Sequence, residues 1–154
     1  MRFPYAMAGS ATPHVLVVED HPATSRIISR VLNEVDPEIS ADVVRDGSEC
    51  LSVLNGEHES IKPPDIVLLD LDLLEVDGLT VLERRAEGGV KGDTPILVIS
   101  GENDAATILE CYRTGANTFF SKPDDLEGYL SLGKSIVDHW LVNAELPRHN
   151  ALNC

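Results

Sequence analysis

Basic residues are scarce in this sequence. The chain has 154 residues and carries 12 Lys and Arg against 26 Asp and Glu, which gives a formal net charge of −14. A charge of that sign opposes non-specific attraction to nucleic acid or to an anionic lipid surface. We therefore expect no direct nucleic-acid contact and no membrane contact, and a basic protein or a divalent cation is the more suitable partner.

Cysteine is also rare, and long apolar runs are missing. Cys50, Cys111 and Cys154 are far apart and outside any CxxC or Cys/His pattern, so they indicate neither a disulfide framework nor a zinc site. No apolar stretch approaches the roughly 20 residues that cross a bilayer, and the N-terminus lacks the apolar core of a signal peptide. These absences predict a cytoplasmic protein with reduced thiols.

Short apolar runs alternate with amphipathic segments along the chain. Runs rich in Val, Ile and Leu suit strands of a parallel sheet that is covered by helices on both faces. We predict such strands at 14–19, 39–44, 65–70, 95–99 and 118–120. This alternation predicts an α/β fold, a flavodoxin-like (βα)5 doubly wound sandwich with a five-stranded parallel sheet.

The segments between the strands have helical spacing. Ser48 is predicted to cap the second helix, and the last helix is predicted to extend from about 124 to 144, with Leu126 on its apolar side. That last helix is an extended C-terminal element. The predicted division is a flexible N-terminal segment at 1–12, one domain at 13–146 and a C-terminal tail at 147–154.

Polar side chains stand where the strands end. Glu19 and Asp20 follow the first strand, Asp70 the third, Ser100 the fourth and Lys122 the fifth. The carboxyl ends of parallel strands meet at one edge of a sheet, where ligands bind. Carboxylates gathered there repel one another, and a divalent cation with oxygen ligands relieves the repulsion. The pattern predicts a Mg²⁺ site, and a cluster of turn residues without a cation is the alternative.

Such a site can act on phosphoryl groups. Carboxylates with Mg²⁺ position a phosphoryl group, and an Asp oxygen can attack phosphorus to form an acyl phosphate. The Lys122 ammonium and the Ser100 hydroxyl would complete the site. Taken singly, a surface lysine and a helix cap are the ordinary interpretations of these two residues.

In this order, the residues resemble the receiver domain of two-component response regulators. The resemblance extends from Val15 to about Leu146. The motifs that carry it are Glu19-Asp20, Pro64 to Asp70, Asp77-Gly78, Ile96 to Gly101 and Gly115 to Pro123. The resemblance implies that Asp70 is the phosphoacceptor and that a sensor histidine kinase is the partner.

The same resemblance implies roles for the residues around Asp70. Asp20, Asp70 and the backbone carbonyl of Asp72 would hold Mg²⁺ directly, and Glu19 would act through water. These assignments come from the family motif and not from spacing alone. The cofactor implied is Mg²⁺.

The resemblance also implies a switch. Lys122 would pair with a phosphate oxygen, the Ser100 hydroxyl would move toward the phosphoryl group, and Phe119 would turn into the vacated space. Asp72 and Glu102 occupy the two variable positions that face the phosphoryl group. Two acids there are expected to affect the attacking water and hence the phosphate lifetime.

Two segments are similar to those of phytochrome-associated single-domain response regulators. These are the insertion from Asn55 to Lys62 and the end of the last helix. The similarity implies a bacteriophytochrome as the candidate kinase and a homodimer in which Trp140, Leu141 and Leu146 take part. A role of Trp140 and Leu141 in covering the core is the equal alternative.

Two other classes remain as alternatives. Asp70-Leu71-Asp72 also resembles the nucleophile motif of haloacid-dehalogenase phosphohydrolases, although those enzymes begin with the nucleophile strand and have a further acidic motif after the lysine. A receiver-like binding module that signals without phosphate is the third possibility. The receiver resemblance implies a signalling protein and not an enzyme, apart from self-phosphorylation and slow autodephosphorylation.

Overall fold

The computed structural model describes residues 12–88 and 93–147. Expectations about the N-terminal segment, the tail and Cys154 lie almost entirely outside the described residues. Cys50 and Cys111 are free thiols, as expected, and both are buried. Among the described residues, no helix is both long enough and apolar enough to span a bilayer.

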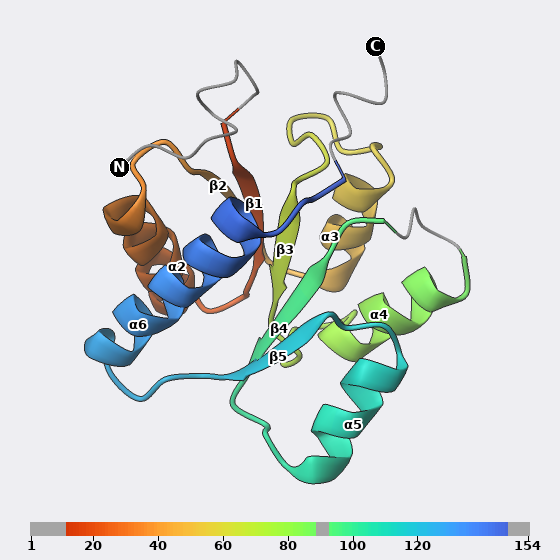
Figure 1. The fold of residues 1–154 in the computed structure, drawn as a ribbon. Coiled ribbons are helices and arrows are strands. Elements are labelled where there is room, and N and C mark those ends of the chain that lie inside the picture. The colour runs from red at the N-terminus through yellow and green to blue at the C-terminus, as the bar shows by residue number, and fades with distance from the viewer. Residues whose placement is uncertain (1–11, 89–92, 148–154) are drawn as a thin grey trace.

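Five parallel strands form one sheet, and all five predicted strands are confirmed. Their order across the sheet is β2-β1-β3-β4-β5 (Figure 1). The strands are β1 (His14–Val18), β2 (Ser40–Val44), β3 (Ile66–Leu69), β4 (Ile96–Ser100) and β5 (Thr118–Ser121). Every residue of β3 and β4 is buried, as expected for central strands with both faces covered.

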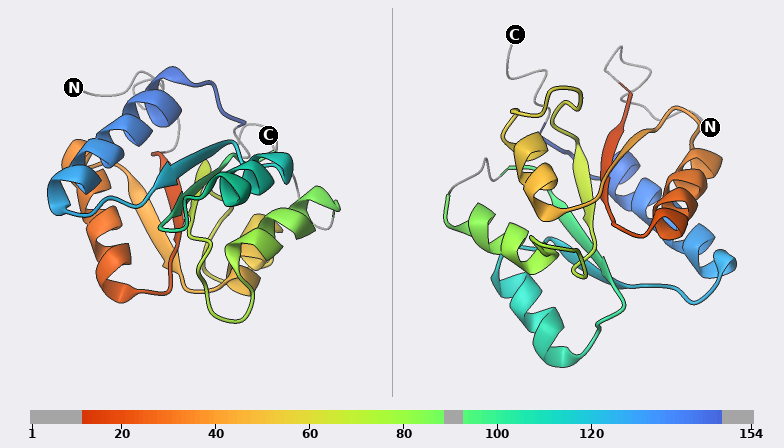
Figure 2. Two further views of the ribbon diagram at one scale, coloured as in Figure 1. Left: turned by 90° about the horizontal axis from the view of Figure 1, so that it is seen from below. Right: turned by 180° about the vertical axis from the view of Figure 1, so that it is seen from behind.

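Five α-helices in the described part of the chain cover the two faces of the sheet. They are α2 (Pro22–Val35), α3 (Gly47–Leu54), α4 (Gly78–Ala86), α5 (Ala105–Arg113) and α6 (Leu126–Ile136). Helices α2 and α6 pack on one face, and α3, α4 and α5 lie on the other (Figures 1 and 2). The predicted flavodoxin-like sandwich is therefore confirmed.

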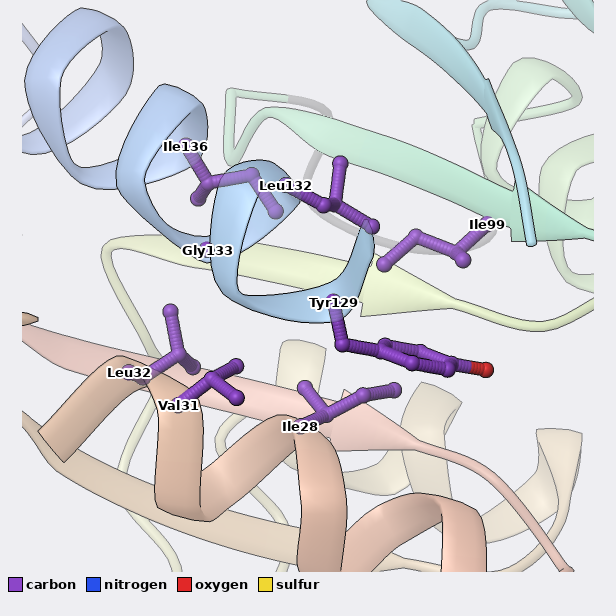
Figure 3. Close-up of a pocket in the computed structure, with 8 residues that line it drawn as sticks. All are labelled: Ile28, Val31, Leu32, Ile99, Tyr129, Leu132, Gly133 and Ile136. Carbon is purple, nitrogen blue, oxygen red and sulfur yellow. The ribbon is translucent and has the colours of Figure 1, made fainter. Parts of the chain in front are cut away.

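The core has one part on each face of the sheet. The part under α2 and α6 includes a small apolar pocket to which α2, α6 and β4 all contribute (Figure 3). Gly133 lies against Val31 there, and a Cβ at position 133 would stand 3.0 Å from Val31 Cγ2. The small residue lets α2 and α6 approach closely.

Carboxylates begin most of the helices. Asp46 Oδ1 accepts a hydrogen bond from Glu49 N at 2.9 Å, so Asp46 and not Ser48 is the N-cap of α3. The prediction of Ser48 was wrong because the extended backbone that a cap needs occurs at Asp46, two residues earlier. Asp77, Asp104 and Asp125 cap α4, α5 and α6 in the same way.

The C-terminal helix differs in part from the prediction. It begins at Leu126, which follows its cap directly and is 59% exposed, so its predicted place on the apolar side was wrong. After Ile136 the helix continues as a π-helix, η1 (Val137–Asn143), and Ala144 N then donates to His139 O at 2.8 Å. The extended C-terminal element is confirmed, and its final segment, η1, is the wider π-helix.

Candidate functional site

The ends of four strands bring the predicted site residues together. Asp70 N donates to Val18 O at 3.0 Å, which places Asp70 beside Glu19. Lys122 N donates to Ser100 O at 2.9 Å, which joins the ends of β5 and β4 in the same way. The residues meet at the carboxyl edge of the sheet, the usual ligand site of an open α/β fold.

Three carboxylates form the acidic part of the site. Glu19, Asp20 and Asp70 each offer an oxygen, and these oxygens all lie within 4.8 Å of one another. Glu19 and Asp70 are buried at 2% and 4% exposure, whereas Asp20 is half-buried. A buried group of like charges needs a cation to offset its repulsion.

Lys122 supplies one positive charge to this group. Its Nζ lies 3.0 Å from Glu19 Oε1 and 3.2 Å from Asp70 Oδ2. One ammonium thus bridges two buried carboxylates, and the predicted convergence of Lys122 with the acids is present in the structure.

The electrostatics of the site follow from burial and charge. Burial and the negative charge of Glu19 raise the pKa of Asp70 to about 6, although Lys122 and the Asp72 backbone N–H act in the opposite direction. Burial alone would lower the pKa of Lys122, but its hydrogen bonds to Glu19 and Asp70 and their charges raise it. The Lys122 ammonium therefore stays charged, and the Asp70 carboxyl ionises at a higher pH than an ordinary Asp side chain.

The donor set suits a divalent cation. Hard cations such as Mg²⁺ prefer oxygen ligands, and the three clustered carboxylates supply them. Asp72 is exposed, and its N–H donates to Asp70 Oδ1 at 3.2 Å, so the loop after β3 turns back toward the site. A cation there would relieve the repulsion between Glu19 and Asp70.

The two predicted switch residues lie on adjacent strands. Ser100 is completely buried, and its Oγ accepts a hydrogen bond from Glu102 N at 3.0 Å. Phe119 is half-buried against the core on the α3, α4 and α5 face, and its N–H donates to the Tyr112 hydroxyl at 3.1 Å. Val98 on β4 is the register partner of Phe119 on β5.

Gly78 is a site residue whose reason was not evident from the sequence. A Cβ there would collide with the backbone carbonyl of Asp70 and would lie 2.8 Å from Leu71 Cα. Gly78 N also donates to Leu71 O at 3.1 Å. The Asp77-Gly78 motif therefore caps α4 and at the same time lets that helix start directly against the backbone of Asp70.

Tyr129 was missed by the sequence reasoning. It is 9% exposed and lines the apolar pocket, with its hydroxyl pointing out of the cluster of aliphatic side chains (Figure 3). Burial raises the pKa of Tyr129, and the charges of Lys122, Glu19 and Asp70 also act on it. Its spacing on α6 is that of an ordinary core residue, so the sequence carried no signal for this proximity.

Comparison with protein families assigns this fold to a known family. The response regulator receiver domain model matches residues 15–131. The chain belongs to this family. The match covers β2 to β5, all of β1 except His14, and each of the residues gathered at the carboxyl edge of the sheet, from Glu19 to Lys122.

Three relatives illustrate the similarity. Response regulator Rcp1 from Synechocystis sp. is 27% identical over 135 residues, which cover 86% of this chain and 92% of Rcp1. A putative transcriptional regulator from Pseudomonas aeruginosa is 34% identical over 80% of this chain, and the chain spans 56% of that protein. The phosphorylated cyanobacterial phytochrome response regulator RcpA is 30% identical, with a TM-score of 0.81 over 90% of this chain and 100% of RcpA.

These relatives bear on the predicted class. The similarity to RcpA confirms the expected likeness to phytochrome-associated response regulators. Rcp1 has been solved in a Mn²⁺-bound form, with a TM-score of 0.78, 27% identity and coverage of 88% of this chain and 99% of Rcp1. The family that matches the chain is the receiver family and not the haloacid-dehalogenase phosphohydrolases. The chain is a response regulator of two-component signalling.

Proposed function

We propose that Asp70 accepts a phosphoryl group from a sensor histidine kinase. The observation that carries the proposal is the buried Asp70 carboxylate, which is paired with Lys122 at 3.2 Å and grouped with Glu19 and Asp20. An Asp oxygen attacks the phosphorus of the phosphohistidine, the P–O bond forms and the P–N bond breaks. The imidazole leaves with the electron pair of that bond and takes a proton, so the product is an aspartyl phosphate.

The surrounding residues would hold the transferring group. Asp20, Asp70 and the Asp72 backbone carbonyl are proposed to hold Mg²⁺, with Glu19 acting through water. Mg²⁺, when bound, neutralises charge on the phosphoryl oxygens. Lys122 already lies beside Asp70 Oδ2, so a small movement of its ammonium would pair it with a phosphoryl oxygen.

Ser100 and Phe119 are proposed as the switch. The Ser100 hydroxyl oxygen accepts a hydrogen bond from Glu102 N, and its O–H would donate a hydrogen bond to a phosphoryl oxygen. Movement of Ser100 would open space beside Phe119, which lies on the neighbouring strand β5 and packs against the core. The switch would thereby pass from the phosphorylation site to the surface around α5 and β5.

The partners are proposed from the relatives and from charge. RcpA is a phytochrome response regulator, which favours a phytochrome-type histidine kinase as the phosphodonor. Trp140 and Leu146 are half-buried at the C-terminal end and would serve a homodimer, whereas Leu141 is 1% exposed within this chain and serves its core. The net charge of −14 argues against direct binding of nucleic acid.

Intact mass spectrometry after incubation with acetyl phosphate and Mg²⁺ tests the proposal. We expect a single phosphoryl adduct on the wild-type protein and on Asp138→Asn, whose exposed carboxylate lies on η1. Asp70→Asn should carry none. An adduct on Asp70→Asn, or its absence from the wild type, would show that Asp70 is not the acceptor.

A further inference from the structure

Arg45 places a positive charge beside the backbone of Asp20, one of the three clustered acids. It follows β2 directly, and the neighbouring Val44 O accepts a hydrogen bond from Glu19 N at 3.0 Å. Arg45 Nη2 in turn donates to Asp20 O at 3.4 Å. The guanidinium is exposed and contacts the backbone of Asp20, the most accessible of the three acids, so it stands at the rim of the acidic site.

A polar network joins Arg45 to the inserted segment 55–62. The backbone N–H of Arg45 donates to Glu49 Oε1 at 3.4 Å, so the network holds Arg45 by its main chain. Glu49 Oε2 in turn lies 3.2 Å from His58 Nε2. His58 Nδ1 accepts hydrogen bonds from the backbone N–H groups of Ser60 and Ile61, both at 3.1 Å. Because Nδ1 is an acceptor, neutral His58 carries its proton on Nε2 and donates to Glu49.

The inserted segment has its own anchor. Ile61 is half-buried and packs against the core on the α3 face. His58 is therefore held by the backbone of a segment that is fixed to the core. We name Arg45, Glu49 and His58 the rim network.

We propose that Arg45 tunes the cation affinity of the acidic site, and that the inserted segment maintains this effect through the rim network. The inference rests on the part of the proposed function that concerns the cation site. A guanidinium beside Asp20 repels a divalent cation, so it weakens cation binding while the carboxylates favour it. Loss of Arg45 would leave the carboxylates unopposed on this side.

The effect has an expected size and salt dependence. A unit charge at the rim, partly screened by solvent, is expected to change divalent-cation affinity by about threefold at low ionic strength. The difference should shrink toward onefold in roughly 0.5 M salt, where the Debye length is only a few ångströms. A purely structural role of Arg45 would not give that salt dependence.

The test is a titration with Mn²⁺, with free ion measured by electron paramagnetic resonance and Mg²⁺ added as competitor. Arg45→Gln should bind both ions about threefold more tightly than the wild type at low salt, and Arg45→Lys should restore the wild-type affinity. Arg30→Gln is the matched control. It removes the same charge from α2, where Arg30 pairs with Glu34 at 3.8 Å, and should leave affinity unchanged. Equal shifts in Arg45→Gln and Arg30→Gln, or no shift in Arg45→Gln, would overturn the proposal.

The second half of the proposal is tested by a double-mutant cycle. His58→Ala should release part of the constraint on Arg45 and tighten binding by less than Arg45→Gln does. In the Arg45→Gln background, His58→Ala should have no further effect. Additive shifts, or an equal shift from the exposed Glu59→Gln, would overturn the role of the inserted segment. These titrations contain no phosphodonor. If Asp70 formed no adduct with acetyl phosphate, the proposed function would therefore be overturned, but the measured effect of Arg45 on cation affinity would stand.

Discussion

The ammonium nitrogen of Lys122 lies 3.2 Å from Oδ2 of Asp70 and 3.0 Å from Oε1 of Glu19. Two buried carboxylates therefore share one cation from the end of β5. This arrangement stabilises the resting site by charge pairing, and it also holds the ammonium next to the atom that would receive phosphorus. Stability and reactivity should consequently depend on the same side chain.

Lys122→Gln should lower both the stability of the protein and the rate at which Asp70 is phosphorylated. Its loss leaves Glu19 and Asp70 without their shared cation, and removal of one partner from a buried ion pair costs about 3 kcal/mol. Adduct formation from acetyl phosphate should slow by about 100-fold because charge stabilisation of the transferring group is lost. Urea unfolding and timed intact-mass measurements check the two effects. Lys122→Arg should restore most of the stability, and an unaffected rate in Lys122→Gln would exclude the role in transfer.

The raised pKa of Asp70 gives a pH dependence with a definite sign. The folded-state pKa is about 6 against an ordinary value of 3.8, so the folded protein binds the proton more tightly than the unfolded chain does. The contribution of Asp70 to stability is then greatest below about pH 4 and is lost as pH rises through 6. In EDTA, Asp70→Asn should be more stable than the wild type at pH 7.5 by on the order of 1–2 kcal/mol.

Urea unfolding at pH 4.5 and pH 7.5 measures this difference. The advantage of Asp70→Asn should be small at the lower pH and larger at the higher pH. Asp138→Asn provides the control, since its exposed carboxylate should give no such trend. A wild-type advantage at pH 7.5 without added cation would show that Lys122 more than offsets burial and Glu19.

Much of the site could be predicted because it depends on strand ends. The apolar runs specify β1, β3 and β4, and the first polar residue after each run then falls at the same edge of the sheet. Glu19, Asp70 and Ser100 follow from that rule. Their roles came from the resemblance to receiver domains, since the fold alone hosts many activities.

Other features depend on geometry that a linear pattern does not contain. Ser48 and Asp46 are both good cap residues, and only the backbone conformation selects Asp46. The shared pairing of Lys122 needs the register of β5 against β4. The π-helical turns of η1 follow a continuous helical pattern, so no change in the residue pattern marks the transition at Val137.

Gly78→Ala should distort the backbone of the site at Asp70 and Leu71. The new methyl group would meet the Asp70 carbonyl and Leu71 Cα, with no flexible side chain to yield, and such overpacking costs about 1–3 kcal/mol. The midpoint temperature of thermal unfolding and the rate of adduct formation should both fall. Gly101→Ala is the matched control beside the same site, because a Cβ there meets nothing within 4 Å. Equal stability of the two variants would contradict the close approach of α4 to Asp70.

Asp72 and Glu102 should control the lifetime of the aspartyl phosphate. Both are exposed, on the loops that follow β3 and β4, and a carboxylate there can orient the water that attacks phosphorus. The double variant Asp72→Asn with Glu102→Gln should lengthen the half-life of the adduct by about tenfold. Decay followed by intact mass after removal of acetyl phosphate gives the measurement. Faster decay in the double variant would mean that the two acids repel water more than they orient it.

Trp140 and Leu146 should contribute to a homodimer. Both are half-buried at the edge of the core under α2 and α6, so each retains apolar surface that a second chain could cover. Trp140→Ala and Leu146→Ala should each weaken the dimer by about tenfold, the usual effect of truncating a large apolar side chain at the centre of an interface. Sedimentation at two concentrations measures the effect. Leu109→Ala, at a residue of α5 that is 48% exposed, should leave the dimer intact. Leu141 lies inside this chain and has no surface to offer a partner. An unchanged dimer in both Trp140→Ala and Leu146→Ala would therefore place the interface on another surface.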